Sequence, residues 1–155
     1  MQKLRTLRIS LRVILAFAVL ANLQGQDRNV AKNFFRQSPG DRIARFRQYS
    51  LGDQYKIFRY GMDKKEPPFM DLANPIAERG EEAVPFLLGQ LNTHPDDLTT
   101  RDILLIFESM AQLKTYEVKS DALLMKTVTS RVSEMKDKEW RTTCSKSIQR
   151  ILENR

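Results

Sequence analysis

The chain has 155 residues, with 26 Lys and Arg against 19 Asp and Glu, and it has one cysteine and one histidine. A single cysteine excludes a disulfide-bonded scaffold, and a single histidine excludes a metal site built from several histidines. The formal net charge of +7 would suit a polyanion such as nucleic acid, but its distribution along the chain changes that expectation.

The first 25 residues have the layout of a secretory signal. Four basic residues and no acidic one accompany an apolar run at 13–21, and a polar stretch with small residues follows. A membrane-spanning helix needs roughly 20 apolar residues, so this run is too short to span. We expect cleavage near Gly25 and a periplasmic or secreted protein. The alternative is a buried or interfacial N-terminal helix.

Removal of residues 1–25 would also remove four of the 26 basic residues. The remaining chain would carry 22 basic against 19 acidic residues, a net charge of +3, so we do not expect nucleic-acid binding. Residues 26–155 fit a single domain of ordinary size, and nothing in them is long and apolar enough to predict a transmembrane span.

The mature chain is predicted to be all-α, because its apolar residues recur at helical spacing and show no sustained alternation typical of strands. Ser38, Ser50 and Thr99 are the expected N-caps. The expected helices, in chain order, are 28–37, 39–48, 51–62, 69–79, 82–92, 100–114, 120–135 and 138–153.

Residues 26–60, here called the basic aromatic front, interleave eight Lys and Arg with seven aromatic residues. Guanidinium groups beside aromatic rings suit an anionic surface on acidic protein, cell-wall polymer, phospholipid or nucleic acid. The alternative interpretation is that many of these rings belong to the core while the arginines form a solvated face. The candidate interaction surface consists of Arg42, Arg45, Arg47, Tyr49 and Arg59.

The next segment, residues 60–80, is rich in proline. Pro67 and Pro68 stiffen a connection between helices, and Pro75 falls inside an apparently helical run. Proline removes a backbone donor, so the run is predicted either to kink at Pro75 or to consist of two short helices that meet at Asn74.

Three later helices carry apolar stripes that need partner helices. The stripe of helix 100–114 is the longest, and the other two lie in helices 120–135 and 138–153. Their members are Ile103, Ile106, Phe107, Met110 and Leu113; Leu124, Val128, Val132 and Met135; and Trp140, Cys144, Ile148 and Ile151.

One stretch resembles a known family. GEEAVPFLLGQLN, residues 80–92, is similar to the first helix of a HEAT-type repeat, and TTRDILLIFESMAQLK would be its antiparallel mate. The small, proline and aliphatic positions that such repeats use are occupied here by Ala83, Val84, Pro85, Leu87, Leu88 and Leu91. The loop that follows is longer than a compact HEAT turn. The resemblance implies a short stack of antiparallel hairpins over 61–155 and binding of other macromolecules, with an irregular helical bundle as the alternative.

No residue pattern predicts catalysis, a metal or a cofactor. Cys144 lies on an apolar stripe without a nucleophile signature, and His94 stands in an expected loop. The carboxylate pairs at 81–82 and 96–97 stand at or before helix starts, where negative charge favours the helix dipole. The sequence predicts an exported, non-enzymatic helical scaffold that binds another protein. The alternative is binding of anionic envelope glycan or lipid through the basic aromatic front.

Overall fold

The computed structural model describes residues 30–94 and 96–154, and these residues form helices and turns without any strand. The prediction of an all-α fold is confirmed. The predicted signal segment, residues 1–25, lies outside the described residues. Among the described helices, none combines the length and the hydropathy that crossing a membrane requires.

The N-terminal part contains a helical segment at 30–36, then α2 (Arg42–Arg47) and α3 (Leu51–Lys64). Ser50 caps α3 as predicted, because its Oγ accepts a hydrogen bond of 3.2 Å from the Asp53 amide. The predicted start of α2 at residue 39 is wrong. Asp41 has φ 53°, a left-handed conformation that cannot belong to a right-handed helix, so α2 begins only at Arg42.

The proline-rich segment forms shorter elements than predicted. A 3-10 turn, η1 (Met70–Leu72), precedes α4 (Ala73–Ala77), so the expected single helix 69–79 is wrong. Pro75 is the third residue of α4, within the first turn, where a missing N–H leaves no intrahelical bond unmade. No long helix kinks at Pro75. The alternative prediction of two short helices is closer, although the first element is a 3-10 turn and the junction lies between Leu72 and Ala73, before Asn74.

Gly80 separates α4 from the next hairpin. Its φ is 56°, and a Cβ at this position would lie 2.5 Å from the carbonyl oxygen of Thr115. Only glycine fits this close backbone approach at a positive φ. The chain then forms the 3-10 turn η2 (Gly80–Ala83) and α5 (Val84–Thr93).

The C-terminal elements are α6 (Asp97–Leu113), the 3-10 turn η3 (Val118–Ser120), α7 (Ala122–Glu134) and α8 (Lys138–Glu153). The bounds of α8 match the prediction. The prediction that Thr99 caps α6 is wrong, because Asp96 accepts a hydrogen bond of 2.8 Å from the Thr99 amide and the helix begins three residues earlier than expected. Asp121 and Asp137 cap α7 and α8 in the same way.

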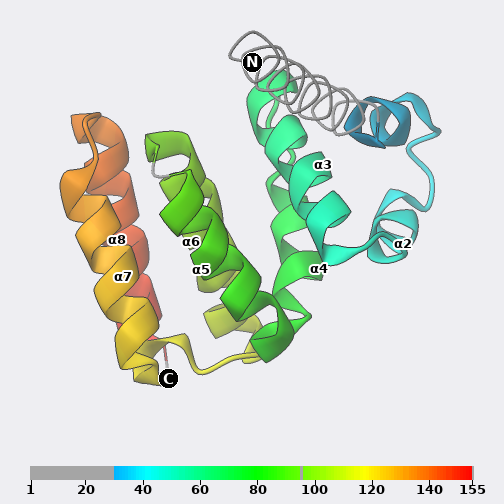
Figure 1. The fold of residues 1–155 in the computed structure, drawn as a ribbon. Coiled ribbons are helices and arrows are strands. Elements are labelled where there is room, and N and C mark those ends of the chain that lie inside the picture. Colours follow the sequence, from blue (N-terminus) through cyan, green and yellow to red (C-terminus); the bar gives the residue numbers. More distant parts are fainter. Residues whose placement is uncertain (1–29, 95, 155) are drawn as a thin grey trace, which may run out of the picture.

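Helices that follow one another in the chain pack together, α3 with the short α4, α5 with α6, and α7 with α8 (Figure 1). α6 also packs against both α4 and α8, and α5 contacts α7, so consecutive pairs lie beside one another. The described buried apolar side chains form one cluster. Burial of each large aliphatic or aromatic side chain stabilises such a core by about 1.5–3 kcal/mol.

The three predicted apolar stripes supply much of this core. The three stripe residues within α7 and Met135 directly after it are buried, and four of the five in α6 are buried, whereas Leu113 at the end of α6 is 45% exposed. In α8, Cys144 and Ile151 are buried while Trp140 and Ile148 are half-buried. The stripes thus identify the faces by which these helices contact their neighbours.

Candidate interaction surface

Arg45 holds the turn that leads into α2, and Arg42 packs on two aromatic rings. The Arg42 guanidinium lies 4.8 Å from the ring centroid of Phe69 and 5.8 Å from that of Phe35. Arg45 donates two hydrogen bonds of 2.6 Å, one to the carbonyl of Gly40 and one to that of Ser38. Both candidate arginines therefore have internal partners.

Arg47 and Tyr49 connect α2 to the proline-rich segment. Arg47 donates hydrogen bonds of 2.8 and 2.6 Å to the two carboxylate oxygens of Glu78, and this hydrogen bonding lowers the pKa of Glu78 below its usual value. The Tyr49 carbonyl accepts a hydrogen bond of 3.0 Å from Arg79, and its ring packs edge-on against Phe34. This exposed ion pair and these backbone contacts hold the α2 region against α4.

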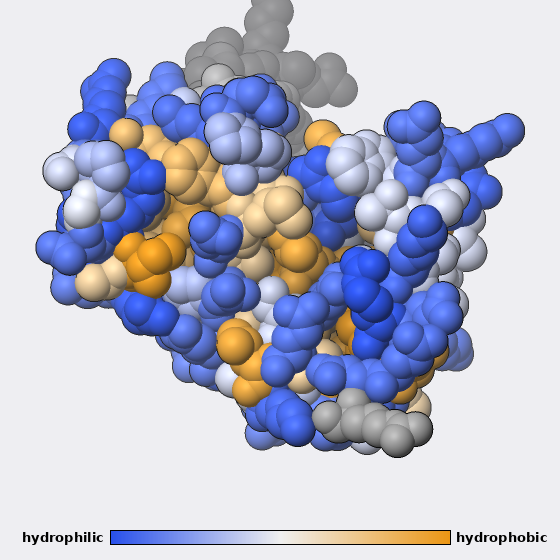
Figure 2. Space-filling model, turned by 180° about the vertical axis from the view of Figure 1, so that it is seen from behind, coloured by the Kyte–Doolittle hydropathy of each residue, from blue (hydrophilic) through white to orange (hydrophobic). Residues whose placement is uncertain are grey.

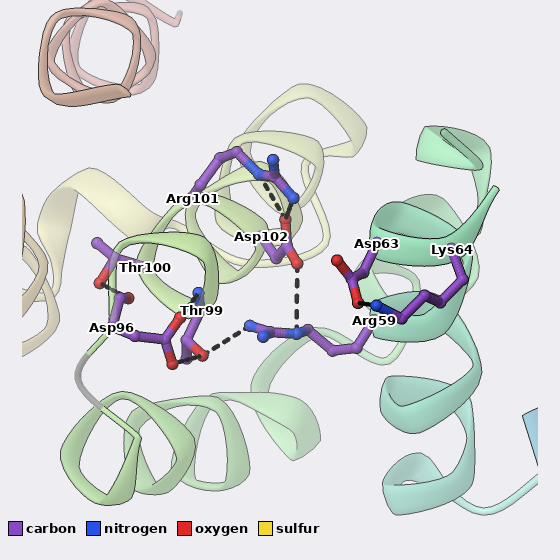
Figure 3. A network of polar contacts seen from close by, with 8 residues as sticks. All are labelled: Arg59, Asp63, Lys64, Asp96, Thr99, Thr100, Arg101 and Asp102. Atoms are coloured by element: carbon purple, nitrogen blue, oxygen red, sulfur yellow. Dashed lines mark hydrogen bonds and ion pairs between the residues drawn. The ribbon is translucent and has the colours of Figure 1, made fainter. Parts of the chain in front are cut away.

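Arg59 lies at the centre of a polar network between α3 and α6 (Figure 3). Its Nη1 donates a hydrogen bond of 2.6 Å to the Thr99 hydroxyl, which in turn donates one of 2.7 Å to Asp96. Its Nε lies 3.4 Å from a carboxylate oxygen of Asp102. Burial disfavours the charged form of Asp96, but the hydrogen bonds from Thr99 outweigh that effect and lower its pKa.

Asp102 is the buried carboxylate of this network, with only 2% of its side chain exposed. Arg101 approaches it with Nε at 2.7 Å and Nη2 at 2.6 Å, and the same guanidinium lies 4.6 Å from the Trp140 ring centroid. Burial raises the pKa of Asp102 above its usual value, and the nearby charges of Arg101 and Arg59 offset this only in part. The carboxylate thus links α3, α6 and α8 at a cost of desolvation.

The cysteine, the histidine and the carboxylate pair at 96–97, which are the side-chain types found in catalytic sites, make contacts that stabilise the fold. Cys144 is buried, and its desolvation raises the pKa of the thiol to about 11. The exposed His94 places Nδ1 2.9 Å from the Thr93 hydroxyl. Asp96 caps α6, and Asp97 accepts hydrogen bonds from the amides that precede α8. Within 30–94 and 96–154, no three His, Cys, Asp or Glu side chains gather in a way that could hold a metal ion.

A basic groove runs between the helical segment 30–36 and α3. One hollow of about 570 Å³ adjoins a second of about 230 Å³, and the two share Lys32 and Tyr60. Their lining includes six basic residues, Lys32, Arg36, Lys56, Arg59, Lys64 and Lys65, and one acidic residue, Asp63. Of the five candidate residues taken from the sequence, only Arg59 lines the groove. The others lie in or beside α2.

An apolar patch, defined here by Phe35, Phe69 and Met70, adjoins this groove. The Phe35 and Phe69 rings lie 5.0 Å apart, Phe35 also lines the smaller hollow, and Met70 is 53% exposed. A Cβ at Gly61 would lie 2.9 Å from the Phe35 ring, so glycine at this position lets the ring approach α3. Figure 2 shows apolar side chains gathered toward the side of α2 and α3 on the reverse face.

The sequence alone does not identify this combination of groove and patch. Lys32, Arg36, Lys56 and Tyr60 all belong to the basic aromatic front, but Lys65, Phe69 and Met70 come from the proline-rich segment. Their proximity depends on the return of the chain after α3, which local periodicity does not predict. Comparison with known proteins gives no further guidance, since no family model, no curated protein and no solved structure matches this chain.

Proposed function

We propose that the protein is an exported, non-enzymatic helical scaffold that binds another protein through its N-terminal end. The observation that supports this most is the apolar patch of Phe35, Phe69 and Met70 beside the basic groove. Met70 presents a flexible apolar side chain to solvent, and the Arg42 guanidinium stacks on the adjacent rings. Aromatic residues, methionine and arginine are enriched at protein interfaces, where a desolvated apolar centre is surrounded by a polar rim.

The experiment that tests this is capture from a native envelope extract with the full chain carrying a C-terminal tag. We expect one stoichiometric protein partner. The intact mass of the tagged chain should correspond to a polypeptide that begins near Gln26. Met70→Glu should remove the partner, because it places a charge at the most exposed member of the patch. Leu123→Glu is the matched control, since Leu123 is 69% exposed on α7 and should leave capture unchanged.

Two results would contradict the proposal. Equal capture by wild type and Met70→Glu would exclude the patch as the binding surface. A chain that retains residues 1–25 in a cytosolic pool would exclude export.

The second candidate function is binding of an anionic envelope glycan or lipid. The excess of basic residues in the groove favours it, because a concave surface of one charge attracts the opposite charge. Arg42 and Arg45, the first candidates from the sequence, are poor positions for testing it. Their substitution would break the internal contacts to Phe69, Ser38 and Gly40. Lys32 and Arg36 are exposed and suit the purpose better.

A further inference from the structure

We infer that the basic groove is the site at which the protein partner inserts an acidic segment. This inference rests on the proposed function, and it names the chemistry of the partner. The groove lies between two elements, with Lys32 and Arg36 on the helical segment 30–36 and Lys56, Tyr60 and Lys64 along one face of α3. Residues four apart on a helix face the same side, so each element presents a row of cations to the hollow.

Some of the basic side chains of the groove already have partners within the protein, and others can bind an incoming anion. Lys56 lies 3.6 Å from Asp53 and Lys64 lies 2.6 Å from Asp63. The Lys65 ammonium lies 5.2 Å from the Phe35 ring centroid. Arg59 is held by Thr99 and Asp102. By contrast, Lys32 and Arg36 are exposed and have no ion pair or hydrogen bond within the part of the chain that the structure describes. These two residues therefore offer unneutralised charge at the edge of the groove.

The position of the apolar patch favours a protein segment over a simple polyanion. Phe35 lines the smaller hollow and also contacts Phe69, so the charged and apolar surfaces are continuous. An acidic segment with neighbouring apolar side chains would use both surfaces, whereas inorganic polyphosphate would use only the charges. Lysine ammonium groups on flexible stems can also accept carboxylates at different spacings.

The test measures binding of a ten-residue peptide of alternating Glu and Leu to the purified full chain. Wild type should bind it with an affinity that falls steeply as salt rises. The double variant Lys32→Glu, Arg36→Glu should bind about tenfold more weakly, since one exposed ion pair contributes roughly 1.4- to 5-fold and two charges are reversed. The control Lys126→Glu, Lys146→Glu makes the same charge change at exposed positions of α7 and α8.

Equal peptide binding by the two double variants would overturn the inference. So would binding of polyphosphate or phosphatidylglycerol vesicles, but not of the peptide, when that binding is lost in Lys32→Glu, Arg36→Glu. Partner capture distinguishes this failure from failure of the proposed function. A partner lost with Met70→Glu but retained by Lys32→Glu, Arg36→Glu would leave the protein-binding function standing and exclude the groove.

Discussion

At the scale of single residues, the arginines of the N-terminal end divide into two groups. Arg42, Arg45, Arg47 and Arg59 make contacts that hold the turn before α2, the α2 to α4 junction and the α3 to α6 junction. Arg36 is exposed. Arginine suits the first role because a planar guanidinium can reach two acceptors, as in Arg45 and Arg47, or stack on aromatic rings, as in Arg42. Composition predicts the abundance of arginine here but not this division of roles.

Asp102 provides a test of the energetics at this scale. Its raised pKa means that the folded protein retains this proton at higher pH than the unfolded chain, so its contribution to stability decreases as pH rises through that value. Asp102→Asn should therefore change the free energy of unfolding by less than about 1 kcal/mol at pH 7, because it removes the desolvation cost. The amide oxygen can still accept from Arg101, and Arg59 keeps Thr99.

Asp102→Ala is the comparison, and it should cost about 2 kcal/mol or more, because it leaves Arg101 without its acceptor. Urea denaturation of both variants measures the difference. An Asn variant as unstable as the Ala variant would show that charge attraction, and not desolvation, dominates at this site.

At the scale of elements, the first residues of the helices are indicated better by N-cap side chains than by apolar periodicity. Ser50, Asp121 and Asp137 accept amide hydrogen bonds at the starts of α3, α7 and α8, and these starts were predicted to within two residues. The α6 start was missed because both Asp96 and Thr99 can cap. The expected helix 69–79 was wrong because its periodicity does not separate a 3-10 turn from an α-helix.

The contribution of the Asp121 cap of α7 to the stability of the protein should depend on pH. The Leu124 amide and the Tyr116 hydroxyl both donate to Asp121 and lower its pKa. Its stabilising effect is therefore present above the usual carboxyl value of 3.8 and is lost as pH falls through the lowered value. Asp121→Ala should cost about 1 kcal/mol at pH 7, and the cost should shrink below that range.

Ser50→Ala is the control for Asp121→Ala. The Ser50 hydroxyl does not itself titrate, although it donates a hydrogen bond of 3.0 Å to the Asp53 carboxylate as well as capping α3. The cost of Ser50→Ala in urea denaturation should change less with pH. A cost for Asp121→Ala that stays constant from pH 7 to pH 2 would contradict the assignment of the carboxylate as the cap.

At the scale of the whole molecule, the sequence predicts the helical class and the buried faces of the later helices, because both depend on local spacing. It does not predict the groove and the apolar patch that form the proposed binding surface. That surface depends on contacts such as Phe35 with Phe69 and Arg59 with Asp102, which join residues far apart in the chain. The basic aromatic front contains both core rings and groove cations, and only the packing of segment 30–36 against α3 separates them. The HEAT-type resemblance stays a prediction.

Amide hydrogen exchange of the full chain, with and without its captured partner, tests whether the N-terminal end binds that partner. Our account predicts slower exchange on binding at residues 30–36, in the C-terminal half of α3 and at 65–72, with little change in α7 and α8. Protection confined to α7 and α8, or no protection in a stoichiometric complex, would contradict the claim that the N-terminal end binds the partner.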